Sequence, residues 1–355
     1  MLRGPARRHA TGRVALVILV GLLGACAPLV RTAAVEGTVS RPRNVIARDL
    51  GISADIAGRV TWLFGDTFYH PRACDGTNLR HSTAAVDRPD GIVGNVTEPV
   101  DSCGAPAELV TPGVAATPGG ARTAFWPDSI VPTLDGRAAV FYQRMLIDGD
   151  VWTVQQTSVA EMGAGPTTLD RTNEAVLFGP QERSYSAGNL VDGGFIYLYA
   201  TDLEPDLRTA YRVARVPHAL YRQRSAYRFW DGTGWSVSSI AAAKVVLRGV
   251  GDEGSGGLGG LTVSWNPYLR RYLMVHSEAW EHDLILRTAA RPEGPWTAPT
   301  HVNVPDSASD SPFGSYTARE HPEFRSADGR TIVITYHRST GGLNGELPVV
   351  RVVLR

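Results

Sequence analysis

The sequence predicts an all-β protein folded as a single-domain, five-bladed β-propeller. Helical patterns are scarce, whereas short β-forming runs broken by Gly, Pro, Asp and Asn are frequent. One hairpin pattern occurs five times, 58–79 residues apart, with openings at Asp49, Asp128, Ser186, Leu261 and His321. Such recurrence is typical of a propeller with insertions between its blades. A two-sheet sandwich is the alternative, but the regular recurrence of one hairpin type argues against it.

The first 25 residues are predicted to form a secretory signal peptide. Basic residues precede an uncharged apolar run at positions 14–25, and this run is too short to span a bilayer as a helix. The basic residues are Arg3, Arg7, Arg8 and Arg13. We therefore expect an exported protein.

Cys26 directly follows the apolar run, in the sequence Leu-Gly-Ala-Cys. This stretch resembles the lipobox of bacterial lipoproteins, in which the cysteine is lipidated and becomes the mature N-terminus. The resemblance implies a lipid anchor on the outer face of the bacterial cell membrane. Residues 26–43 are then expected to be a tether and residues 44–355 the propeller domain. An ordinary signal peptide followed by an incidental cysteine is the alternative.

The two remaining cysteines, Cys74 and Cys103, are predicted to form a disulfide. They are an even pair, in an oxidising compartment if the chain is exported, and both lie among Gly, Pro and Asp residues typical of a surface loop. Two free thiols are the alternative. A metal site is disfavoured because neither cysteine belongs to a CxxC motif or a His/Cys cluster.

The composition points to a neutral partner. Basic and acidic residues balance at 35 each, and no basic block alternates with aromatic residues, so nothing indicates nucleic-acid binding. We expect a monomer that binds polysaccharide and contacts the membrane through its lipid. No GxSxG, HExxH, Walker or helix-opening GxGxxG motif is present. No cofactor is predicted, although a structural calcium ion at the propeller axis stays open because oxygen ligands would be available there.

Each repeat consists of a strand of modest polarity, a turn and a strongly β-forming strand. In chain order the hairpins cover residues 47–68, 127–145, 185–202, 260–278 and 320–339. Hairpin turn residues join the strands of the last four: Asp135-Gly136, Asp192-Gly193-Gly194, Asn266-Pro267 and Asp328-Gly329. Outer strands are expected at 209–217, 284–292 and 349–355. Either the last of these or the segment near 33–39 is expected to close the ring.

This arrangement predicts a face rich in carboxylates. An antiparallel hairpin returns the chain to the end where it began, so Asp49 and Asp66 should lie at the same end of the first blade. The same reasoning assigns to this face Asp128, Gln143, Arg144, Tyr185, Asp202, His276, Glu278, Glu320, His321, Tyr336 and His337. A ligand pocket is expected at this mouth.

Six motifs give the chain a family resemblance. They are RDLGIS, WLFGDTF, WPDSIVP, ARVP, GPW and EHPEF, which lie between Arg48 and Phe324, and the resemblance extends from about Asn44 to the C-terminus. The chain resembles the bacterial propeller family catalogued as domain of unknown function 4185, some of whose members are endo-D-arabinanases. The most specific element pairs an early aspartate, Asp49, with a strand that ends in Trp-x-x-Gly-Asp-Thr. The resemblance implies hydrolysis of an arabinofuranose-rich cell-envelope glycan.

Glycoside hydrolysis needs two carboxyl groups, one to protonate the leaving oxygen and one to activate water or attack the anomeric carbon. Related five-bladed furanosidases place aspartates on the first and second blades and an acid on a later blade, and the resemblance assigns Asp49 and Asp128 to the first two positions. The candidate catalytic residues are Asp49, Asp66, Asp128 and Glu320, with Glu278 as a second candidate acid. The candidate substrate-binding residues are Trp126, Arg144, Tyr185, Glu278, Tyr316 and His321.

Several candidates also have structural interpretations. Asp66 and Asp128 could each serve a turn, and Asp49 could form a surface ion pair with Arg48. His321 could be a core histidine and Glu278 a solvated surface residue. The functional alternative is a non-catalytic propeller that binds a cell-wall glycan or an envelope protein. A third acid beside Asp49 and Asp128 at the mouth would separate these two functions.

Overall fold

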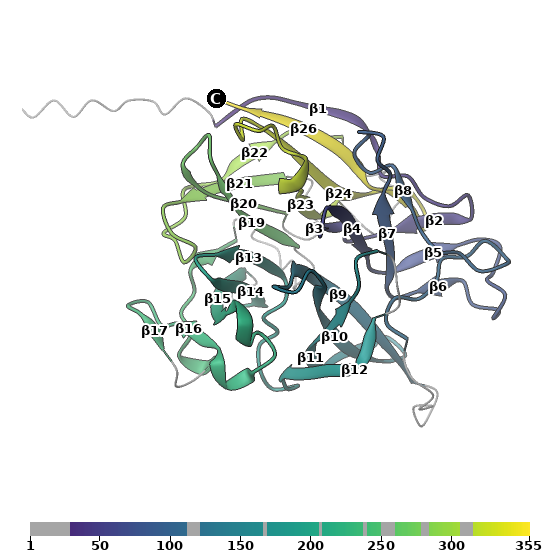
Figure 1. Ribbon diagram of the computed structural model, residues 1–355, viewed down its shortest axis with the longest axis horizontal. Helices are drawn as coiled ribbons and strands as arrows, with labels where there is room; N and C mark the ends of the chain where they lie inside the picture. Colours follow the sequence, from purple (N-terminus) through teal and green to yellow (C-terminus); the bar gives the residue numbers. More distant parts are fainter. Residues whose placement is uncertain are drawn as a thin grey trace, which may run out of the picture.

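The chain is all-β. The computed structural model describes residues 29–111, 121–165, 169–205, 208–236, 240–249, 260–277, 284–305 and 315–355. Helical structure in these ranges is confined to short 3₁₀ segments, and none of them has the length and apolar character of a membrane span. The strands form six sheets, which are arranged around a common centre (Figure 1).

The first two sheets precede residue 180. One has the order β3-β4-β7-β8, with β3 at Ile52–Ile56, β4 at Arg59–Phe64, β7 at Thr83–Asp87 and β8 at Val96–Thr97. The next has the order β9-β10-β11-β12, with β9 at Arg122–Pro132, β10 at Ala138–Asp148, β11 at Val151–Met162 and β12 at Asp170–Phe178.

Two further sheets follow in chain order. The third contains β13 (Gly188–Asp192), β14 (Phe195–Leu203), β15 (Thr209–Pro217), β16 (Arg228–Trp230) and β17 (Trp235–Ser236), with β18 (Leu247–Arg248) paired to β15. The fourth contains β19 (Leu261–Asn266), β20 (Arg271–Ser277), β21 (Leu284–Ala289) and β22 (Thr300–Val302).

The fifth sheet joins the two ends of the described chain. It has the order β23-β24-β26-β1, with β23 at Tyr316–Glu320, β24 at Thr331–Gly341, β26 at Pro348–Leu354 and β1 at Val30–Thr38, and β25 (Asn344–Glu346) pairs with β24. The smaller sixth sheet contains β2 (Val45–Arg48), β5 (Thr67–Tyr69) and β6 (Leu79–Arg80).

The five expected hairpins are confirmed as β3-β4, β9-β10, β13-β14, β19-β20 and β23-β24. The expected openings of the second and fifth hairpins were wrong. β9 begins at Arg122 rather than Asp128. β23 begins at Tyr316 rather than His321, because the 3₁₀ segment Pro322–Phe324 occupies the stretch between the strand and the turn.

The segment at residues 26–43, expected to be a tether, includes the first strand. Residues 30–38 of that segment form β1, which pairs antiparallel with β26 from Val30↔Leu354 to Thr38↔Pro348. The strand near residues 33–39 therefore completes the sheet begun at the other end of the chain. Cys26 lies outside the described residues.

Apolar layers lie between the five larger sheets. Buried side chains pack the first sheet against the second, the second against the third, the third against the fourth, the fourth against the fifth, and the fifth against the first. Trp62 and Phe64, for example, pack with Val333 and Val349. Burying one such side chain contributes roughly 1.5–3 kcal/mol. The first strands of consecutive sheets meet near the centre, where β9 contacts β3 and β13, and β19 contacts β13 and β23.

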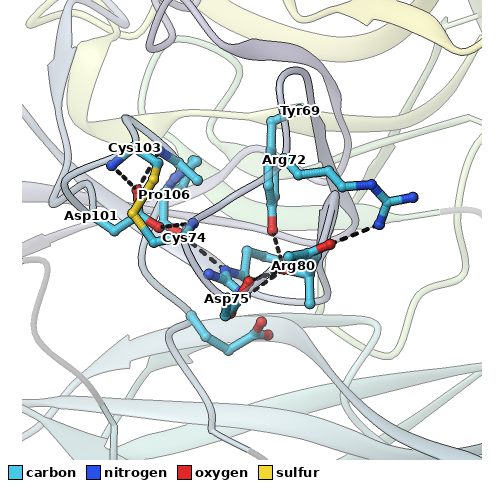
Figure 2. Close-up of polar contacts among 12 residues, drawn as sticks. Tyr69, Arg72, Cys74, Asp75, Arg80, Asp101, Cys103 and Pro106 are labelled. Atoms are coloured by element: carbon cyan, nitrogen blue, oxygen red, sulfur yellow. Dashed lines mark hydrogen bonds and ion pairs between the residues drawn. A yellow bond between two sulfur atoms is a disulfide. The ribbon is translucent and has the colours of Figure 1, made fainter.

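The predicted disulfide joins Cys74 to Cys103 (Figure 2). Asp101 braces the same loop, since its carboxylate accepts hydrogen bonds from the backbone N–H groups of Cys74 at 3.1 Å and Cys103 at 2.9 Å. In the described part of the chain, these three residues are the only His/Cys/Asp/Glu group compact enough for a metal ion. Because both sulfurs are in the disulfide, this group is structural.

Candidate functional site

A cavity of about 520 Å³ lies where the first strands of the sheets begin. Its wall includes the loop before β3, the middle of β9, the segment before β13 and the start of β23. The ionisable and amide side chains that line it include Asp49, Asp66, Asp128, Gln143, Glu182, Arg183, Asp202, Arg319, His337 and Asn344. Aromatic side chains also line it: Phe68, Trp126, Trp152 and Tyr316.

Asp49 connects β2 to β3 and lies partly buried in the wall of this cavity. Its Oδ2 accepts a hydrogen bond from the Tyr316 hydroxyl at 3.1 Å, and its buried Oδ1 has no partner among the described residues. Burial, with a further contribution from the negative charge of Asp66, raises the pKa of Asp49 to about 8. Asp49 is therefore protonated at neutral pH and can donate a proton.

The expected alternative for Asp49, an ion pair with Arg48, is wrong. The Arg48 guanidinium is buried and bonds Glu98 at 2.8 Å, and its carbon lies 3.6 Å from the centre of the Phe64 ring. Arg48 also lines the cavity, but its charge is paired with Glu98. Asp49 therefore does not form an ion pair with Arg48.

Asp66 follows β4, where the chain returns to the end of the hairpin at which Asp49 precedes β3. Its Oδ1 accepts hydrogen bonds from Trp126 Nε1 at 3.0 Å and from His81 Nδ1 at 2.7 Å. Both partners come from other segments, which favours a role in the site over a local turn cap. Two N–H donors match the acceptor-only chemistry of an ionised carboxylate.

Gly65 explains how the two aspartates come together. A Cβ atom at this position would lie 2.4 Å from Asp49 Oδ1 and 2.8 Å from Leu50 Cδ1. The Gly65 N–H also donates to the Asp49 carbonyl at 3.2 Å. Glycine is required because the Asp49 carboxyl lies directly against the backbone that carries Asp66.

Asp128 reaches the cavity through a β-bulge. Pro127 pairs with Tyr142 and Ser129 with Phe141, so Asp128 is an extra residue in β9. Its Oδ2 accepts hydrogen bonds from Gln143 at 2.7 Å and from Ser186 at 2.6 Å. Burial raises the pKa of Asp128, while the positive charge of Arg319 opposes that rise.

Arg319 is a cation in this cavity wall that the sequence analysis did not single out. It is buried, and it donates to the carbonyls of Ala187 at 2.8 Å and of Leu261. Burial lowers its pKa to about 10, so it stays charged at neutral pH. Its anchors lie at the starts of β13 and β19, which holds the charge near Asp128.

Glu320 does not line the cavity. Because β23 starts at Tyr316, Glu320 lies four residues further along the strand, where its Oε2 accepts a hydrogen bond from Ser264 at 2.6 Å. His321 is a core histidine. Its Nδ1 contacts Ser53 Oγ at 2.5 Å, its ring lies 4.5 Å from that of Trp62, and burial lowers its pKa to about 3.

Two expected substrate contacts point elsewhere. Gln143 and Met145 line the cavity from β10, so Arg144 between them faces the other side of the sheet. Tyr185 is fully buried and packs its ring 5.4 Å from Phe178. Trp126 and Tyr316 do line the cavity, and Glu278 lies outside the described residues.

The sequence predicted some of the other residues near the cavity and missed others. Asp202 and His337, expected on this face, line the cavity, whereas His276 and Tyr336 do not. Asp202 accepts hydrogen bonds from Arg183 at 2.9 Å and from Arg212. Trp152, which lines the cavity, and His81, which bonds Asp66, were missed because their positions depend on hairpin length and loop path, for which the sequence carries no signal.

Several solved structures with a similar fold are glycoside hydrolases. The RS223 β-xylosidase has a TM-score of 0.50 at 12% identity, over 89% of this chain and 98% of that one. An exo-β-1,3-galactanase from Phanerochaete chrysosporium has a TM-score of 0.51 at 11% identity, and the match covers 90% of this chain and 64% of that one. A family 117 glycoside hydrolase from Zobellia galactanivorans has a TM-score of 0.50 at 12% identity, and the match covers 91% of this chain and 89% of that one. At these identities the likeness establishes the fold alone, which is β-propeller-like.

No curated protein matches the sequence. A family model does match, over residues 36–339, and its description is "Domain of unknown function (DUF4185)". This range includes Asp49, Asp66, Asp128 and the other residues that line the cavity, except those beyond residue 339. The chain belongs to the DUF4185 family.

Proposed function

We propose that the protein is a glycoside hydrolase that cleaves an arabinofuranose-rich cell-envelope glycan, in the manner of an endo-D-arabinanase. The observation that carries this proposal is the Asp49–Asp66 pair, two carboxyl groups in one cavity with different surroundings. Glycoside hydrolysis requires such a division between a proton donor and a carboxylate. The arabinan specificity rests on the family resemblance.

In the proposed mechanism Asp49 is the general acid. Its protonated carboxyl donates a proton to the leaving glycosidic oxygen. From the sequence, Glu320 was a candidate for this role. Asp66, held by Trp126 and His81, supplies the carboxylate that attacks the anomeric carbon or activates water. Asp128, fixed by Ser186 and Gln143, orients the sugar and adds negative potential as positive charge develops on the ring.

We further propose that the fold is a five-bladed propeller and that the protein is exported and lipid-anchored. The five larger sheets are the blades of a five-bladed propeller, supported by apolar packing between each sheet and its two neighbours. Residues 1–25 are a signal peptide, and Cys26 carries the lipid that holds a monomeric domain at the outer face of the membrane. The basic flank, the apolar run and the lipobox-like sequence support this setting.

The direct test is incubation of a protein that lacks the signal and Cys26 with arabinogalactan, followed by chromatography of the released oligosaccharides. Wild-type protein should release products, and Asp49→Asn, Asp66→Asn and Asp128→Asn should each lose at least ~100-fold activity. Asp55→Asn is the matched control, since Asp55 is exposed at the far end of β3 and bonds the Gly58 N–H.

The outcomes separate catalysis from binding. If the Asp49 and Asp66 variants cleave like wild type, the catalytic proposal is wrong. Binding of the glycan without any cleavage by wild-type protein would instead identify a non-catalytic glycan-binding propeller. Melting temperatures of all variants, measured alongside, show whether a lost activity reflects lost folding.

A further inference from the structure

The hairpin β10-β11 extends past its outer neighbour. β11 pairs with β12 only from Thr157 to Glu161, so the distal part of the hairpin, from Met145 to Val154, has no partner from β12. A separate apolar cluster supports this part: Ala124, Met145 and Ile147 are buried, with Trp126 and Val154 packed against them. The distal hairpin is therefore a supported projection at the cavity rim.

Trp152 stands on this projection and lines the cavity. It lies two residues before Val154, on the same face of β11, and both residues are in the cavity wall. Its ring centre is 5.3 Å from that of Trp126, at an interplanar angle of 55°. Half of the Trp152 surface is exposed. A large aromatic surface is thus presented to solvent beside the proposed reaction centre.

The tryptophan pair is connected to that centre by a hydrogen bond. Trp126 donates from Nε1 to Asp66 Oδ1 at 3.0 Å, so a group stacked on Trp152 lies next to the ring that holds the carboxylate. Leu343, in the β24-β25 turn, also lines the wall and is 52% exposed. Apolar side chains from two hairpins therefore line an acidic cavity.

We propose that Trp152, with Trp126, forms a stacking platform for a sugar ring next to the ring being cleaved. The inference rests on the proposed function and deepens it, since it makes the protein prefer glycan chains over single sugars. Sugars present C–H groups on one ring face, and aromatic rings bind such faces through apolar contact while the hydroxyls keep their hydrogen bonds. Trp152 is a binding residue in this proposal and takes no part in bond cleavage.

The test compares a polymer with a small substrate. Trp152→Ala should raise KM for arabinan chains about tenfold with kcat within twofold, since a lost aromatic contact is worth roughly that factor. The KM for p-nitrophenyl arabinofuranoside, which has one sugar ring, should rise less than the KM for the polymer, and Trp152→Phe should recover most of the polymer KM. Trp265→Ala is the matched control, because Trp265 is 44% exposed on β19 and does not line the cavity.

A binding measurement keeps this proposal distinct from the proposed chemistry. In the Asp49→Asn background, calorimetry with arabinan oligosaccharides should show about tenfold weaker binding when Trp152 is also Ala, and no change when Trp265 is Ala. This difference supports the platform even if wild-type protein has no hydrolytic activity. Equal affinities for the two proteins, or no binding by either, would overturn it.

Discussion

The Asp49 carboxyl lies against the backbone of Gly65, so closely that a Cβ atom there would come within 2.4 Å of Oδ1. This contact brings the acid at the start of the first hairpin to the carboxylate that follows its end. It also makes a residue without a side chain part of the proposed catalytic arrangement. The first prediction tests this relationship.

Gly65→Ala should displace the Asp49 carboxyl and lower activity at least ~100-fold, the usual cost of a misplaced acid-base group. The free energy of unfolding should fall by only ~1–3 kcal/mol, as for other overpacked sites. Glycan cleavage and chemical denaturation measure the two effects. Gly163→Ala is the control, because a Cβ there meets nothing within 4 Å. Full activity in the Gly65 variant would show that the close contact has no role in catalysis.

The raised pKa of Asp49 predicts a pH limit on activity. A general acid must be protonated, so kcat/KM should fall as the pH rises through about 8, the pKa of Asp49 in the folded protein. An activity profile from pH 5 to 10, at constant ionic strength, measures it. A rate that stays level to pH 10 would exclude Asp49 as the proton donor.

The same shift predicts how stability depends on pH. Folding raises the pKa of Asp49 above its unfolded value of 3.8, so the protonated carboxyl favours the folded state. That contribution is complete below about pH 4 and is lost progressively as the pH approaches 8. The melting temperature of Asp49→Asn should therefore rise relative to wild type across this window. Parallel curves for the two proteins would contradict the assignment.

Removing the disulfide should destabilise the domain without abolishing the local loop. Cys74 and Cys103 are 29 residues apart, for which the chain-entropy model gives ~3–4 kcal/mol. The double variant Cys74→Ala/Cys103→Ala should lose about that free energy of unfolding and become insensitive to reducing agent. Asp101 still bonds the backbone there, so glycan cleavage should persist. Equal stability with and without reductant in wild type would refute the prediction.

Cys26→Ala should remove the proposed lipid and release the exported domain from membranes. One lipid signal gives limited attachment, so fractionation in parallel with wild type is needed to measure the change. Mass spectrometry of the wild-type N-terminus should find the modified cysteine. Unchanged fractionation with an uncleaved N-terminus would instead mean that residues 14–25 act as the anchor.

Hairpin geometry predicted part of the cavity lining from the sequence. Asp49, Asp66 and Asp128 line one cavity, as the return of each hairpin to its starting end predicts. The errors concern register. Glu320 is too far along β23 because the sequence does not mark where an inner strand starts, and Arg144 faces away because a strand alternates at every residue.

Longer-range features left no signal in the sequence. The bulge at Asp128 and the unpaired projection that carries Trp152 depend on how three strands of one sheet align. The partnership of Arg48 with Glu98 joins residues 50 positions apart and removes the ion pair that proximity to Asp49 suggests. Only the folded sheets define these contacts.

The pairing of β1 with β26 has a consequence for the order of folding. The last strand of the chain must be synthesised before Val30 can find Leu354, more than 300 residues away. Closing a loop of that length is slow, and the other four large sheets can form first. If the chain is exported as proposed, β26 must cross the membrane before this pairing can form. The β1–β26 contact would then be made last, on the outer side of the membrane.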